Sequence, residues 1–147
     1  MLRRLMKTDA PGATLFIRVM VGGVFLSEGI QKFAFPDQRG AGRFADLGLP
    51  MPELLGPFVG GVEVLCGTLV FLGMFTRLAC VPLVVIMLVA LATTKVPTLL
   101  QDGFWQAAHD SRTDVSMLLG SIFLIIVGGG RGSPDANLSR DDDEIEV

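Results

Sequence analysis

The sequence predicts an all-α fold, a bundle of four antiparallel transmembrane helices. Half of its 147 residues are hydrophobic, and the mean hydropathy of +0.57 is higher than that of an ordinary soluble domain. The apolar residues fall into four blocks, each close to the roughly 20 residues that a helix needs to cross the hydrocarbon core. We therefore expect one membrane domain at residues 13–130, preceded by a cytoplasmic segment at 1–12 and followed by an acidic, disordered tail at 131–147.

The first span is expected at residues 13–35, behind a basic flank and too long for a cleavable signal peptide. It should end at Phe35, because a residue before proline is disfavoured in the α conformation. The Gly- and Pro-rich loop at 36–52 contains an amphipathic stretch, 43–49, that predicts a short interfacial helix. Since basic flanks stay on the cytoplasmic side, both termini are expected in the cytoplasm.

The second span is expected at residues 53–75 and the third at 78–94, ending at Lys95. The turn between them contains Thr76 and Arg77 and is short, which makes the two spans antiparallel neighbours. Small residues allow helices to approach closely. The glycines expected to serve this purpose are Gly22 and Gly29 in the first span and Gly56, Gly60 and Gly67 in the second.

The fourth span is expected at residues 114–128, with a start up to two turns earlier, near Ala107. The loop before it, 96–113, contains Phe104 and Trp105, aromatic residues that suit a membrane interface.

Charged residues inside the spans predict a polar cluster. At about 100° per residue, Arg18, Glu28 and Lys32 share one stripe of the first span. At about 1.5 Å per residue, Glu63 lies about 21 Å from the inner edge and Glu28 about 24 Å, so the two carboxylates share a depth. Asp114 should enter from the outer end of the fourth span, level with Lys32. Intramembrane charges usually face a protein interior and have a partner.

Two interpretations of this cluster remain open. It is either a ligand-binding or proton-handling pocket that opens outward, or an ion-pair network that only fixes helix register. In the first, Lys32 is a hydrogen-bond donor oriented by Asp114, and Glu28 and Glu63 accept protons. His109 is a candidate proton carrier above the cluster or a solvated loop residue. Arg18 is expected to reach inward to the interface or to lipid phosphate.

The remaining chemistry-bearing residues argue against a self-sufficient enzyme. Cys66 and Cys80 fall within apolar blocks and form no C-x-x-C pair, which predicts buried free thiols rather than a redox dithiol. We expect no metal site, no covalently bound cofactor and no nucleic-acid partner. The chain is therefore interpreted as a non-catalytic or accessory subunit.

Short motifs follow one another in a distinctive order, from the first span to the exit of the fourth. They are Arg18-x-x-x-Gly22, Glu28-Gly29-x-x-Lys32-Phe33, Leu47-Gly48-Leu49-Pro50-x-Pro52, Glu63-x-x-x-Gly67, Gly73-x-x-Thr76-Arg77 and Gly130-Arg131-Gly132-Ser133-Pro134-Asp135. Over residues 13–138 the sequence thereby resembles the DoxX family of small four-helix bacterial membrane proteins.

The resemblance implies a place in the bacterial inner membrane and a link to redox chemistry. The family's namesake is similar to a subunit of a thiosulfate:quinone oxidoreductase, and other relatives are associated with redox defence or with maturation of periplasmic redox enzymes. The leading hypothesis is an accessory subunit of a quinone- or thiol-linked redox system, with the lipid bilayer, a membrane or periplasmic oxidoreductase and a second copy of the chain as partners. The alternatives are a structural or assembly subunit and a component of small-molecule transport.

Overall fold

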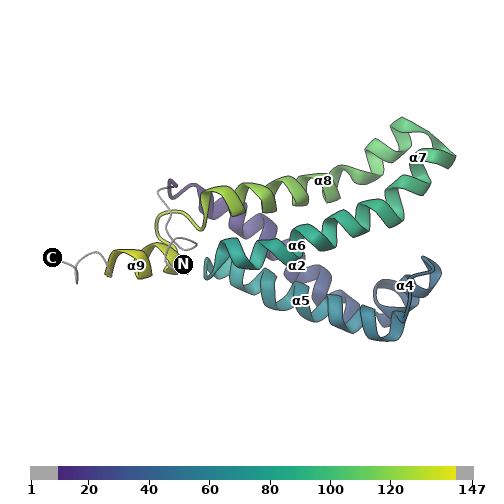
Figure 1. Cartoon of the computed structure of the whole chain (residues 1–147), viewed down its shortest axis with the longest axis horizontal. Coiled ribbons are helices and arrows are strands. Elements are labelled where there is room, and N and C mark those ends of the chain that lie inside the picture. Colours follow the sequence, from purple (N-terminus) through teal and green to yellow (C-terminus); the bar gives the residue numbers. More distant parts are fainter. Residues whose placement is uncertain (1–9, 142–147) are drawn as a thin grey trace.

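The computed structural model describes residues 10–141, and every regular element in that range is a helix (Figure 1). Residues 1–9 and 142–147, which belong to the predicted N-terminal segment and acidic tail, lie outside the described residues. The elements are α2 (Thr14–Ala34), α3 (Pro36–Arg39), α4 (Ala41–Asp46), α5 (Pro52–Leu72), α6 (Thr76–Ala90), the π-helix η1 (Leu91–Lys95), α7 (Val96–Asp102), α8 (Phe104–Val127) and α9 (Pro134–Asp141).

Four long helical rods form the body of the protein: α2, α5, the continuous rod Thr76–Asp102, and α8. The first three are long and apolar enough to cross a membrane. The fourth, α8, has 24 residues but carries Asp110, Arg112 and Asp114 in its N-terminal half. The rods pack as two pairs, α2 with α5 and α6 with α8, joined through α5 and α6.

The two ends of the bundle differ. At one end, which we call the terminal end, the α5–α6 turn lies close to the start of α9 (Figure 1). At the other, the hairpin end, α4 and the α7–α8 turn are separated, because α5 and the α6–α7 rod diverge in that direction (Figure 1).

Glycines bring α2 and α5 into backbone contact at two levels. A Cβ atom added to Gly22 would lie 2.7 Å from the carbonyl oxygen of Gly67, and one added to Gly29 would lie 2.7 Å from the carbonyl oxygen of Gly60. Real Cβ atoms do not approach backbone so closely, so only glycine allows this spacing. The prediction that these glycines permit close helix approach is confirmed.

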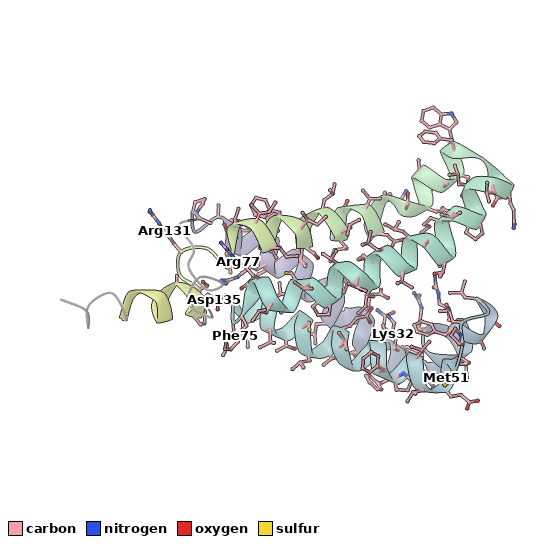
Figure 2. All side chains as sticks on the ribbon, in the orientation of Figure 1. Lys32, Met51, Phe75, Arg77, Arg131 and Asp135 are labelled. Carbon is pink, nitrogen blue, oxygen red and sulfur yellow. The ribbon has the colours of Figure 1, made fainter. Side chains whose placement is uncertain are left out.

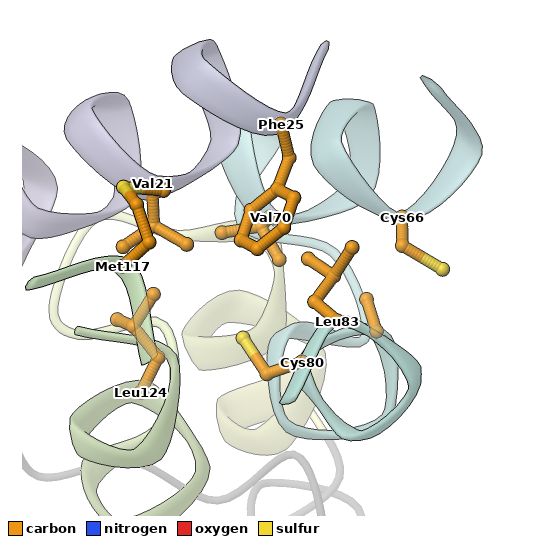
Figure 3. Packing of buried hydrophobic residues seen from close by; sticks show 9 residues of the cluster. Val21, Phe25, Cys66, Val70, Cys80, Leu83, Met117 and Leu124 are labelled. Atoms are coloured by element: carbon orange, nitrogen blue, oxygen red, sulfur yellow. The ribbon is translucent and has the colours of Figure 1, made fainter. Parts of the chain in front are cut away.

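The apolar core lies where the two helix pairs meet. Figure 3 shows Val21 and Phe25 of α2 facing Leu83 of α6 and Leu124 of α8. Its other buried members are Cys66, Val70, Ala79, Cys80 and Met117. Both cysteines are buried free thiols, as predicted.

The predicted end of the third span at Lys95 is wrong, because the helix continues to Asp102. The five-residue π-helix Leu91–Lys95 shifts the helical register, and Pro97 then falls in the first turn of α7. Proline is tolerated there because its missing N–H is not needed. The Thr94 hydroxyl also donates a hydrogen bond to the carbonyl of Ala90, at 2.6 Å.

Two other elements differ from the predicted boundaries. The last long helix begins at Phe104 rather than near Ala107, because Gly103 adopts a φ of 88° and reverses the chain directly after α7. The interfacial segment forms two short helices, α3 and α4, where one was predicted at residues 43–49.

Candidate functional site

A pocket of about 480 Å³ lies at the hairpin end, between α2, α4, α5, α6 and α8. Most of its lining is apolar, from residues such as Phe44, Leu55 and Val85. The charged residues among the lining are Glu28, Lys32, Arg39, Arg43, Glu63, Lys95 and Asp114. The structure therefore places the predicted cluster of Glu28, Lys32, Glu63 and Asp114 around one cavity.

A buried ion pair forms part of the pocket wall. The Nζ atom of Lys32 lies 2.6 Å from Oε2 of Glu63, and the two side chains are only 10% and 3% exposed. Figure 2 shows Lys32 toward the hairpin end of the bundle. At this distance the opposite charges attract each other strongly and hold the two helices together at this level.

The glycine contact between α2 and α5 explains why this ion pair forms. A Cβ atom on Gly60 would lie 3.2 Å from the Cβ atom of Lys32. The missing side chain at Gly60 therefore leaves a path along which Lys32 reaches Glu63, about one turn further along α5.

A second ion pair lies on the opposite wall. Lys95 of η1 approaches Asp114 of α8, with 3.2 Å between Nζ and Oδ2, and both side chains are partly exposed. The sequence predicted that Asp114 would orient Lys32, but the ion pairs of the described residues join Lys32 to Glu63 and Lys95 to Asp114. Lys95 can reach Asp114 because the third rod continues past residue 95 and packs along α8.

His109 lies on the exposed surface of α8, outside the group of side chains that line the pocket. Its Nε2 atom is 2.8 Å from Nη1 of Arg112, one turn along the same helix. The structure places His109 on helix α8 rather than in a loop, and away from the pocket lining.

Arg18 does not reach the interface or lipid phosphate as predicted. Its side chain is 5% exposed, and its Nη1 atom donates a hydrogen bond of 3.0 Å to the carbonyl of Gly129. A Cβ atom on Gly73 would collide with the guanidinium. Arg18 therefore joins the first span to the α5–α6 turn and to the segment that follows α8.

Asp135 completes this second polar cluster, which Figure 2 shows at the terminal end beside Phe75. Its buried carboxylate accepts hydrogen bonds from the backbone N–H groups of Phe75, at 2.7 Å, and Thr76, at 2.9 Å. Its own N–H donates to the carbonyl of Gly73, at 3.2 Å. We call this cluster the terminal clasp; its members are Arg18, Gly73, Phe75, Thr76, Gly129, Ser133 and Asp135.

The clasp changes the interpretation of the predicted tail and turn. A disordered tail was predicted at residues 131–147, but in its described part Ser133 and Asp135 are buried and α9 begins at Pro134. Of the predicted turn motif, Thr76 is fully buried, and its N–H is held by Asp135. Arg77 follows it at the start of α6, with its guanidinium at the terminal end in Figure 2.

Comparison with known proteins defines the family. The DoxX family model matches residues 13–96, from the start of α2 to the start of α7. The chain belongs to the DoxX family. An uncharacterized membrane protein of Mycobacterium tuberculosis, Rv3486, is 49% identical over 143 residues, which cover 93% of this chain and 88% of that protein. No solved structure matches the chain.

The pocket of this DoxX protein offers both a donor and acceptors to a ligand. Lys32 carries three N–H donors, and the carboxylates of Glu28 and Glu63 accept hydrogen bonds or protons. Among the described residues, no group of three or more His, Cys, Asp or Glu side chains could hold a metal ion. The arrangement therefore suits recognition of a polar head group attached to an apolar body.

Two sets of residues were not predicted from the sequence. Arg39, Arg43 and Lys95 line the pocket, although the sequence places them in the first loop, at the start of the interfacial helix and at the end of the third span. The clasp had a readable signal in Ser133-Pro134-Asp135, because serine before proline is a common start of a helix. The Ser133 hydroxyl indeed accepts a hydrogen bond of 3.2 Å from the N–H of Ala136.

Proposed function

We propose that this DoxX-family protein is an accessory membrane subunit of a quinone- or thiol-linked redox system, and that its pocket binds the head group of a quinone. In this proposal α8 is the fourth span, both termini are cytoplasmic, and the pocket opens toward the outer side of the inner membrane. The supporting observation is the Lys32–Glu63 ion pair, which is buried in the wall of an otherwise largely apolar cavity.

A quinone has a polar head group and an apolar tail, and the cavity has polar and apolar lining for both. Its carbonyl oxygens accept hydrogen bonds, which Lys32 can donate, and the hydroxyls of its reduced form can donate to Glu63 or Glu28. Its ring and tail suit the apolar lining. An ion pair that served only helix register would gain nothing from facing a pocket of about 480 Å³.

Glu63→Gln tests this role, because glutamine keeps the size of the side chain and removes its charge. A lost charge-assisted hydrogen bond is worth about 1.5–3 kcal/mol, so affinity for the reduced quinone, whose hydroxyls donate to Glu63, should fall about tenfold or more. The measurement is titration of the purified protein, in nanodiscs and under reducing conditions, with a short-chain quinol. Glu53→Gln is the control, since Glu53 is exposed on the same helix and does not line the pocket.

The same experiment separates binding from an architectural role. If Glu63→Gln removes folded protein, Lys32→Gln combined with Glu63→Gln gives a neutral hydrogen-bonding pair in which neither charge is left unpaired. A folded variant that binds quinone as tightly as the wild type would contradict the proposal. A loss of stability with unchanged quinone affinity would favour the structural or assembly role instead.

A further inference from the structure

Two arginines at the pocket have no ionic partner among the described residues. Arg39 of α3 and Arg43 of α4 both line the cavity, and both are exposed. The other two cations of the lining are neutralised, Lys32 by Glu63 and Lys95 by Asp114. With Glu28 as the third anion, the lining has four cations and three anions, so one positive charge is in excess, and it comes from the α3–α4 side.

The segment that carries these arginines is held firmly against the bundle. A Cβ atom on Gly56 of α5 would lie 2.7 Å from the backbone nitrogen of Ala41, so α4 and α5 touch backbone to backbone. The positions of Arg39 and Arg43 beside the cavity are thus set by helix packing.

The surroundings of the arginines are apolar. Phe44 and Leu47 of the same segment line the cavity, together with Leu55 and Phe58 of α5. A ligand that pairs with the two arginines and also packs against these apolar side chains needs an anionic head with several oxygen acceptors and a hydrocarbon chain. Paired guanidinium groups match phosphate oxygens especially well.

We propose that the pocket mouth is a binding site for an anionic phospholipid, whose phosphate lies between Arg39 and Arg43 and whose acyl chain enters the cavity. The phosphate subsite at Arg39 and Arg43 is separate from the ion pair assigned to quinone binding, so it would stand if the quinone proposal failed. The acyl chain and a quinone tail would compete for the apolar part of the cavity. A bound lipid would form the side of the pocket that faces the bilayer.

The test measures lipid retention by native mass spectrometry of the full chain in detergent. Phosphatidylglycerol is the anionic probe, phosphatidylcholine the zwitterionic one, and glycerol phosphate the soluble one. We expect one phosphatidylglycerol per wild-type chain. The combined Arg39→Gln and Arg43→Gln variant should bind it at least tenfold more weakly. Arg131→Gln, which removes an exposed arginine at the terminal end, should bind it as the wild type does.

A pocket-filling variant tests the position of the acyl chain. Ala90 of α6 lines the cavity, so Ala90→Phe should weaken phosphatidylglycerol retention while both arginines remain. Melting curves in phosphatidylcholine verify that each variant is folded. Equal retention by the double arginine variant, or by Ala90→Phe, would overturn the proposal, as would equally tight binding of glycerol phosphate or of phosphatidylcholine.

Discussion

Replacing Gly29 with alanine is expected to destabilise the whole bundle, although it adds a single methyl group. The new Cβ atom would lie 2.7 Å from the carbonyl oxygen of Gly60 and 2.8 Å from the backbone nitrogen of Val64. Backbone cannot move aside as a side chain can, so α2 and α5 must separate. Overpacking of this kind costs about 1–3 kcal/mol. Thermal or denaturant unfolding in lipid-containing micelles measures the loss.

Gly23→Ala is the matched control, because Gly23 lies on the same helix and a Cβ atom there meets nothing within 4 Å. Its unfolding midpoint should equal or slightly exceed that of the wild type, since alanine favours the helix. Equal stability of the two variants would show that the backbone contact between α2 and α5 does not hold the bundle together.

The same substitution should also weaken ligand binding. Lys32 reaches Glu63 by passing over Gly60, so a wider gap between α2 and α5 lengthens the ion pair. The glycine contact between α2 and α5 therefore positions the charges of Lys32 and Glu63, which lie on different helices.

The dependence of the site on helix contacts explains how much of it the sequence could predict. Helical periodicity and depth place Glu28 and Glu63 at one level, and small residues indicate which helices touch. Periodicity and residue size depend only on the local sequence and are the same in the folded protein. The membrane helices and the grouping of the pocket residues can therefore be predicted from them. The partner of Asp114 does not follow from them, because Lys95 is the last residue of the π-helix Leu91–Lys95, whose wider turn changes the face of the rod on which Lys95 lies.

The contacts of the terminal clasp could not be predicted for a different reason, although Ser133-Pro134-Asp135 indicated the start of a helix. Arg18 and Gly129 are 111 positions apart in the chain, and Asp135 reaches Thr76 across 59 positions. The acidic run at 141–147 suggests a solvated tail when composition alone is considered. Only the fold shows that Ser133 and Asp135, at the start of the predicted tail, close the terminal end of the bundle.

Asp135→Asn should be the most damaging conservative substitution in the clasp. The buried carboxylate accepts from the N–H groups of Phe75 and Thr76, which begin α6, and its charge acts on the buried guanidinium of Arg18. Asparagine offers one acceptor oxygen where two donors converge, so an N–H group of the helix start loses its partner. Hydrogen bonds to charged groups are worth about 1.5–3 kcal/mol each, and we expect a loss of about 3 kcal/mol in unfolding free energy.

The substitution should also act locally, through the turn before α6. Phe75 adopts a left-handed conformation with a φ of 49°, which is unfavourable for a bulky residue and is held in place by Asp135. Limited proteolysis should therefore cut near Phe75 and Pro134 in Asp135→Asn before global unfolding begins. Asp46→Asn, at an exposed position on α4, is the control and should leave both the cleavage pattern and the unfolding midpoint unchanged. If Asp135→Asn resists protease as well as the wild type does, the prediction is contradicted. The segment after α8 would then be held by its backbone contacts to Gly73 and Ala10, and the carboxylate would contribute little to the stability of the terminal end.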